Sequence, residues 1–264
     1  MPILDHLGEL RRRLTIVVIA ILLGSVIIYV ATPTIIGFLI APIKEFLPEG
    51  ANGEGALTVT TSLGGFTARF KVAFFVSIIV CAPLIIWEFM AFFLPALTKK
   101  ERRWVVPTVA AMIILFFIGV AFCYAVILRA AFGWLIAQTT DGFGIGNFLA
   151  DAEDYIGIIL LLEIGFGFAF QLPLLIFYLS VLHIVPYKVF RENWRYVYVG
   201  LLCLSAVVTP DASPVTMLLM FGALLALYEL ALAISRYILI ARDGKESLKW
   251  TREQYQDYKA SLDD

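Results

Sequence analysis

Two glutamates in this sequence lie inside short basic patches, each beside a long apolar segment. Glu9 precedes three consecutive arginines in residues 6–13, and Glu101 lies between lysines and arginines in residues 99–103. Lysine and arginine suffice to orient a protein in a membrane, so the two carboxylates need another explanation. Either their neighbours neutralise them in exposed ion pairs, worth about 0–1 kcal/mol each, or they are free to accept a visiting guanidinium.

In the second alternative the two carboxylates would recognise arginine side chains. A bidentate contact between a guanidinium and a carboxylate is charge-assisted, and lysine cannot reproduce the planar fork of arginine. It requires that the local cations turn toward lipid phosphates and leave both carboxylates unpaired. Two carboxylates at one membrane face would then recognise two arginines. Residue chemistry alone leaves both alternatives open.

Acidic and amide side chains inside the apolar segments are further candidates. A charged group at bilayer depth costs about 2.5–3.5 kcal/mol and normally has a partner or a water-lined site. Glu163 lies about 12 Å into its segment, and Gln171 follows two turns later on a similar face. This pair indicates either a polar stripe that contacts a partner helix or a hydrogen bond inside the bundle. Glu229, two turns before Arg236, and Glu88 are expected to extend toward the membrane surface.

The sequence contains no catalytic or metal-binding set. His6 and His183 are not paired with other ligands at metal-binding spacing, and no phosphate-binding loop, nucleophile elbow or zinc-protease motif occurs. The cysteines are odd in number, lie inside apolar segments and show no CxxC spacing, which predicts packing roles. We therefore expect no enzyme, no cofactor, no metal and no nucleic-acid partner.

Composition indicates a membrane protein. Hydrophobic residues make up 61% of the 264 positions and charged residues 16%, which a water-soluble protein of this size cannot accommodate. We predict an all-α polytopic membrane protein in which residues 1–240 form a six-helix transmembrane domain and residues 241–264 a cytoplasmic tail. The fifth segment is too short to cross a hydrocarbon core of about 30 Å. The predicted spans are residues 14–31, 72–94, 105–128, 156–182, 196–208 and 215–234.

The distribution of cations predicts the orientation. Sixteen of the 20 lysines and arginines fall on one side if the N-terminus is cytoplasmic, so both termini are predicted inside. The outer loop over residues 32–70 is expected to hold an amphipathic helix over residues 35–47, and residues 209–214 a tight turn between spans five and six. Prolines and glycines inside the spans indicate either a curved, concave wall or the ordinary composition of membrane helices.

Short motifs occur in a fixed order along nearly the whole chain. They are His6-Leu7-x-Glu9-Leu10-Arg11-x-Arg13-Leu14, Ala41-Pro42, Leu94-Pro95-Ala96-Leu97, Glu101-Arg102-Arg103, Phe166-Gly167-x-x-Phe170-Gln171-x-Pro173, Arg195-Tyr196, Thr209-Pro210-Asp211 and Tyr228-Glu229. In this order, and against six spans, they resemble the TatC family, the receptor subunit of the twin-arginine protein translocase.

The resemblance implies a cupped six-helix receptor in the cytoplasmic (inner) membrane that binds the twin-arginine signal peptides of folded cargo. It would export folded proteins with the proton motive force, oligomerise in the complex and assemble with the single-span subunits TatA and TatB. The residues that it assigns to the signal peptide are Glu9, Arg11, Phe92, Glu101 and Arg103. Those assigned to partner contact or transport are Pro42, Gln171, Asp211 and Glu229, to which we add Glu163.

The chain departs from the family at Gln171, where the family residue is often Glu. Gln171 therefore supplies no charge at this position, although its amide still forms hydrogen bonds with a partner helix. We hypothesise that Glu163, two turns away, takes over the acidic function.

Two other functional classes compete with the receptor. A secondary transporter of a small solute or ion is the main alternative, because buried acids and proline-broken helices also mark such sites. That class predicts an inverted repeat and a midplane site, and neither is visible in the sequence. A structural scaffold would leave Glu9 and Glu101 free to vary.

Overall fold

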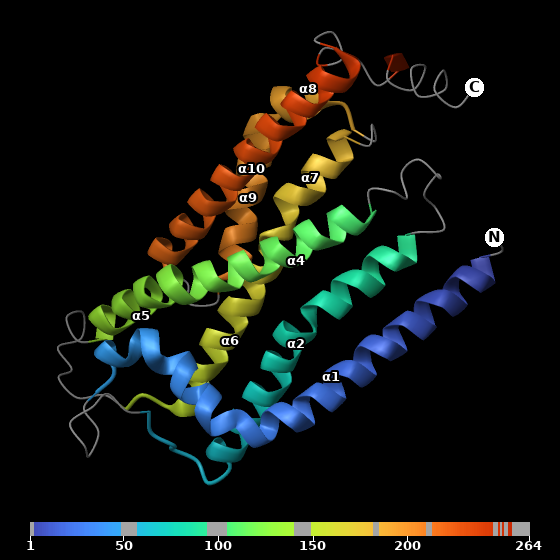
Figure 1. Cartoon of the computed structure of the whole chain (residues 1–264). Coiled ribbons are helices and arrows are strands. Elements are labelled where there is room, and N and C mark those ends of the chain that lie inside the picture. The colour runs from blue at the N-terminus through green and yellow to red at the C-terminus, as the bar shows by residue number, and fades with distance from the viewer. Residues whose placement is uncertain are drawn as a thin grey trace.

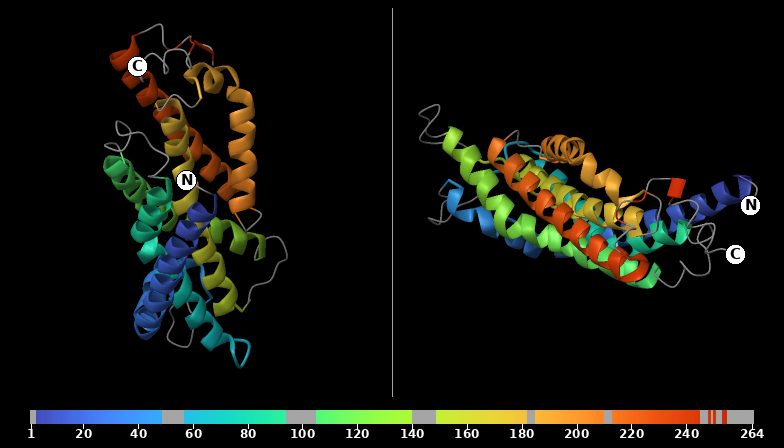
Figure 2. Two further views of the ribbon diagram at one scale, coloured as in Figure 1. Left: turned by 90° about the vertical axis from the view of Figure 1, so that its right-hand side faces the viewer. Right: turned by 90° about the horizontal axis from the view of Figure 1, so that it is seen from above.

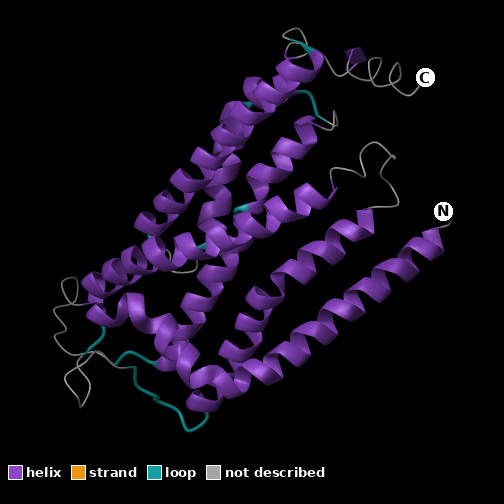
Figure 3. Cartoon of the chain, viewed as in Figure 1, coloured by secondary structure: helices purple, strands orange, loops and turns teal. Residues whose placement is uncertain are grey.

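The chain folds into a bundle of long helices. The computed structural model describes residues 3–48, 57–93, 105–139, 149–181, 185–209, 213–244, 248, 250 and 253–254. Within these ranges nearly all residues are helical, and pairing of extended chain is limited to one bridge between Thr58 and Asp151 (Figures 1 and 3). Five helices there are long and apolar enough to cross a membrane, and another apolar helix is shorter. The predicted all-α polytopic fold is confirmed.

The helices run back and forth between two ends of the bundle. In chain order they are α1 (Ile3–Ile40), the 3-10 helix η1 (Ala41–Phe46), α2 (Gly64–Phe93), α4 (Val105–Phe122), the π-helix η3 (Cys123–Ile127), α5 (Leu128–Ala137), α6 (Ala152–Ala169), α7 (Gln171–Val181), α8 (Tyr187–Glu192), α9 (Trp194–Val208) and α10 (Pro214–Asp243). Figures 1 and 2 show the start of α1, the end of α2 and the end of α10 at one end, which we call the terminal end. η1 and α5 lie at the other, the η1 end.

α1 extends beyond its predicted boundary at residue 31. It continues to Ile40, and the expected separate amphipathic helix over residues 35–47 is wrong. Pro33 lies inside α1 and lacks the N–H that would bond to the carbonyl of Tyr29. In the structure Arg69 of α2 donates to that carbonyl at 3.4 Å, and its guanidinium lies 4.7 Å from the centroid of the Tyr29 ring. The neighbouring helix therefore supplies the missing donor.

The third span also continues past its predicted end at residue 128. α4, η3 and α5 follow one another without a break to Ala137, because Ala131 and Phe132 carry the buried apolar face onward. At the π-helical turn the Tyr124 hydroxyl donates to the carbonyl of Phe38 at 2.8 Å, and the two rings stack with centroids 4.6 Å apart. These contacts attach the end of α1 to this helix.

The predicted fourth span is divided into two helices. α6 begins after its N-cap Asp151, whose carboxylate accepts a hydrogen bond from the amide of Glu153 at 2.8 Å. α6 ends before Phe170, and α7 follows directly. Pro173, in the first turn of α7, lacks the N–H that would bond back to α6. The proline thus breaks the helical hydrogen-bond ladder at the centre of the span.

The loop before α2 is hydrogen-bonded to the start of α6 at the η1 end. The amide and carbonyl of Thr58 bond to the residues on either side of Asp151, each at 2.8 Å. The Asp151 carboxylate accepts further hydrogen bonds from the hydroxyl and amide of Thr60, and these bonds hold the pKa of that carboxyl below its usual value. Lys71 of α2 and Glu153 of α6 form an ion pair at 2.8 Å.

The interior lies between α2, η3, α5, α6 and α10. Glycines allow α4 and α6 to approach closely, since a Cβ on Gly119 would lie 2.8 Å from the carbonyl oxygen of Phe166. α1 packs chiefly against α2 and presents apolar side chains such as Ile27 and Val30, 73% and 79% exposed, on its outer face. Such exposure suits a lipid-facing helix. α9 is the short apolar helix, with 15 residues.

Candidate functional site

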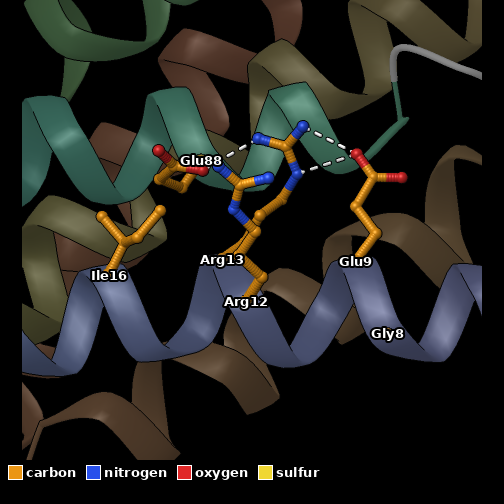
Figure 4. Close-up of a pocket in the computed structure, with 6 residues that line it drawn as sticks. All are labelled: Gly8, Glu9, Arg12, Arg13, Ile16 and Glu88. Atoms are coloured by element: carbon orange, nitrogen blue, oxygen red, sulfur yellow. Dashed lines mark hydrogen bonds and ion pairs between the residues drawn. The ribbon is translucent and has the colours of Figure 1, made fainter.

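A cluster of charged side chains joins α1 to α2 at the terminal end. The Arg13 guanidinium donates from Nε and Nη2 to Glu9 Oε1 at 3.1 and 2.7 Å, and from Nη1 to Glu88 Oε2 at 2.8 Å. Figure 4 shows this guanidinium between the two carboxylates, one from each helix. Glu9 lies one turn from Arg13, whereas Glu88 is 75 residues away in sequence. One arginine therefore connects two helices through opposite edges of its planar fork.

This cluster forms the wall of an open pocket of about 510 Å³, lined by Gly8, Glu9, Arg12, Arg13, Ile16 and Glu88. The Glu9 side chain keeps 28% of its accessible surface and that of Glu88 only 13%. Both nitrogens that reach Glu9 converge on Oε1, so its other oxygen, Oε2, lies outside the pair (Figure 4). Glu9 thus forms the ion pair of the first alternative and still presents a carboxylate oxygen to the pocket.

The other residues predicted to bind a signal peptide are only partly placed. Glu101 and Arg103 lie outside the described residues. Arg11 is exposed on α1, and Phe92 lies one turn beyond Glu88 on α2. The residue that sequence reasoning missed is Glu88, which was expected only to extend toward the membrane surface. The sequence feature that could have identified Glu88 is an acid near the end of an apolar span, at the membrane face that is also predicted to carry the arginines of residues 11–13.

The comparisons with known proteins identify the family. The family model described as Sec-independent protein translocase protein (TatC) matches residues 5–222. The chain belongs to the TatC family. It is a subunit of a Sec-independent protein translocase, a multi-pass membrane protein that serves transport and is not an enzyme.

TatC proteins of other organisms match along most of their length. The chain is 33% identical to a Sec-independent protein translocase protein TatC of Deinococcus radiodurans over 246 residues, 93% of this chain and 90% of that protein. It is 32% identical to TatC of Escherichia coli K12, over 89% of this chain and 88% of that protein. A crystal structure of a twin arginine translocase receptor, TatC, superposes with a TM-score of 0.73 at 28% identity, covering 88% of this chain and 98% of that one.

The two polar residues predicted as a stripe in the fourth span occupy different environments. Gln171 donates from Nε2 to the carbonyls of Met112 and Gly167 at 3.2 and 3.4 Å, which attaches α7 to α4. Its buried Oε1 has no hydrogen-bond partner among the described residues. Glu163 is only 4% exposed within α6, and in the part of the chain that the structure describes no hydrogen bond joins it to Gln171.

Glu229 is held by neighbouring helices instead of extending toward Arg236. It accepts a hydrogen bond from the Tyr198 hydroxyl at 2.6 Å and pairs with Arg191 at 3.1 Å. The nearby Glu229 carboxylate raises the pKa of Arg191 above its usual value. The cluster joins α8, α9 and α10, and Arg236 is exposed.

The remaining predicted positions are Pro42 and Asp211. Pro42 is buried in the first turn of η1, which follows α1 directly, and it lacks the N–H that would bond back to the last turn of α1. Asp211 lies outside the described residues. Among the described side chains no group of three or more His, Cys, Asp or Glu lies close enough together to hold a metal ion.

Proposed function

We propose that this TatC-family chain is the translocase subunit that binds the twin-arginine signal peptides of folded cargo. The observation that carries the proposal is the Glu9 carboxylate, which is partly exposed in an open pocket and already accepts a guanidinium. A carboxylate that accepts the fork of Arg13 also suits an arginine from a peptide. The similar crystal structure is that of a twin arginine translocase receptor, which supports the same function.

In this proposal Glu9 and Glu101 accept the two arginines of the peptide. Arg11, Phe92 and Arg103 complete the site. The exposure of Arg11 and the position of Phe92, one turn beyond Glu88, support their inclusion.

A second set of residues contacts partner subunits or supports transport. The partners are the single-span subunits TatA and TatB, and the chain oligomerises in the complex. The Gln171 amide oxygen, which has no hydrogen-bond partner among the described residues, lies beside the break between α6 and α7 and favours a polar contact at this position. The residues of this set are Pro42, Glu163, Gln171, Asp211 and Glu229.

The proposed location is the cytoplasmic (inner) membrane, with both termini inside. The excess of cations in the predicted inner segments supports this orientation. Without an ATPase motif, export of folded proteins would draw on the proton motive force, since the membrane potential supplies about 2.3 kcal/mol per charge per 100 mV.

Peptide binding by the purified protein tests the proposal. We expect a fluorescent twin-arginine peptide to bind, and the Lys-Lys peptide and the Glu9→Ala and Glu101→Ala variants each to lose affinity by about tenfold or more, because a hydrogen bond to a charged group contributes about 1.5–3 kcal/mol. Glu45→Ala is the matched control, since Glu45 is exposed in η1 at the opposite end. Unchanged binding by the Glu9→Ala/Glu101→Ala double variant would contradict the proposal.

A further inference from the structure

Arg13 occupies the carboxylate that the proposed function assigns to an arginine of the signal peptide. We propose that Arg13 is an internal competitor that bridges Glu9 and Glu88 in the free receptor and is held by Glu88 alone when a peptide binds. Glu88 thereby becomes a residue of the recognition site. This inference rests on the proposed function, because it concerns the regulation of the same pocket.

The geometry at Glu9 requires Arg13 to move. A bidentate contact from a peptide guanidinium uses both carboxylate oxygens. Arg13 directs two of its nitrogens to Oε1, at 3.1 and 2.7 Å, and leaves only Oε2 outside the pair. An incoming arginine therefore makes a first contact with Oε2 and completes its fork only after Arg13 withdraws from Oε1.

Glu88 provides the position to which Arg13 withdraws. Its contact, at 2.8 Å, uses Nη1 on the opposite edge of the guanidinium and is independent of Glu9. The Glu88 side chain is 13% exposed and that of Glu9 28%, so solvent screens the Glu88 contact less. The Glu9 contact, although it has two hydrogen bonds and the Glu88 contact one, is thus the more accessible to an incoming arginine and is the one that the peptide displaces.

The charges of the pocket fit this exchange. In the free receptor two carboxylates share the Arg13 guanidinium. Arg12 also lines the pocket, but it is exposed and forms no ion pair with the other described residues. When a peptide arginine joins, each carboxylate has a guanidinium of its own. Without Glu88, Arg13 would either stay on Glu9 or oppose the incoming arginine by like charge.

The test compares peptide affinity among the parent chain, Arg13→Gln, Glu88→Gln and the double variant. Removing the competitor in Arg13→Gln should tighten binding of the twin-arginine peptide by about two- to fivefold, the range expected for one partly exposed ion pair. Glu88→Gln leaves Glu9 as the only partner of Arg13 and should weaken binding by a similar factor. In the double variant the Glu88→Gln change should have no effect, because no Arg13 remains to be released.

Arg12→Gln is the matched control, since it removes the same charge from the same pocket without breaking an ion pair in the described structure. It should change the affinity less than Arg13→Gln does. Arg13→Lys keeps the charge and loses the fork, so it should also bind the peptide more tightly than the parent. It serves as the second variant if thermal unfolding shows that Arg13→Gln does not fold.

Two results would overturn the inference. Weaker binding by both Arg13 variants would make Arg13 a positioning residue for Glu9. An equal effect of Glu88→Gln with and without Arg13 would show that Glu88 does not act through Arg13. Failure of the proposed function would look different, because the parent chain would then not distinguish the twin-arginine peptide from the Lys-Lys peptide and Glu9→Ala would bind as the parent does.

Discussion

Glu163 is a buried carboxylate with no hydrogen-bond partner among the described residues, and it lies in a membrane-spanning helix. Such a group normally costs stability, because a charged or polar side chain loses its hydration without compensation. This cost is the reason to test Glu163 for a functional role. The neutral Gln171, two turns away, is the position at which an acid was expected from the family resemblance.

We expect Glu163→Gln to lower the export of a folded twin-arginine reporter while leaving the melting temperature unchanged or higher, because neutralisation removes a desolvation cost. Gln171→Glu should restore export in this background by returning an acid to the same span. Reporter export and thermal unfolding of the purified protein measure the two effects. Export by Glu163→Ala equal to that of the parent chain would show that Glu163 has no acidic role.

At the candidate site, local contacts could be predicted from the sequence and long-range ones could not. The pair of Glu9 and Arg13 follows from a spacing of four residues on a helix. The contact of Arg13 with Glu88 depends on the register of α1 against α2, which no local pattern specifies. The same holds for Glu229, whose partners Arg191 and Tyr198 come from two other helices.

At the scale of helices, two prolines show why boundaries were harder to predict than helices. Pro173 coincides with a break between α6 and α7, whereas α1 passes through Pro33 without interruption. The difference lies in Arg69, which donates to the carbonyl of Tyr29 that Pro33 leaves free. Residue type alone therefore predicts a weak point in a helix, and the neighbouring helix decides whether it breaks.

A double-mutant cycle tests this account of α1. Arg69→Met removes the guanidinium and keeps a long apolar stem, and we expect it to destabilise the parent by about 1–2 kcal/mol. In the Pro33→Ala background the loss should be smaller, because residue 33 then supplies its own N–H to Tyr29. Thermal unfolding of the four proteins in detergent measures the coupling. Equal losses in both backgrounds would indicate that Arg69 acts only through its contact with the Tyr29 ring.

Across the whole molecule, the two ends of the bundle differ in chemistry. The terminal end holds the Arg13 cluster and the η1 end holds the hydrogen bonds of Asp151 and the Lys71–Glu153 pair. Composition predicts the number of spans because the apolar segments are long and separated by polar residues. It does not predict which spans are neighbours, since all six are similarly apolar and the specific contacts come from scattered residues such as Gly119.

The orientation of the bundle depends on charge, because either orientation would bury the same apolar surface in the bilayer. Sixteen of the 20 lysines and arginines lie in the predicted inner segments, which favours the terminal end in the cytoplasm. Glu45 in η1 and Glu192 in α8 are both exposed, and these two helices lie at opposite ends of the bundle (Figure 1). With the exposed Cys203 replaced by Ala, we expect Glu45→Cys to react with a membrane-impermeant maleimide in intact spheroplasts, and Glu192→Cys only after disruption.

The parent carrying only the Cys203→Ala change gives the background from Cys81 and Cys123, which are half-buried and buried. The opposite labelling pattern would contradict the predicted orientation. The same result would also contradict the proposed receptor function, because the pocket of Glu9 and Arg13 would then face away from the compartment in which signal peptides are made. Orientation and recognition are thus tested together, since a carboxylate site selects arginines only on the side where the cargo is present.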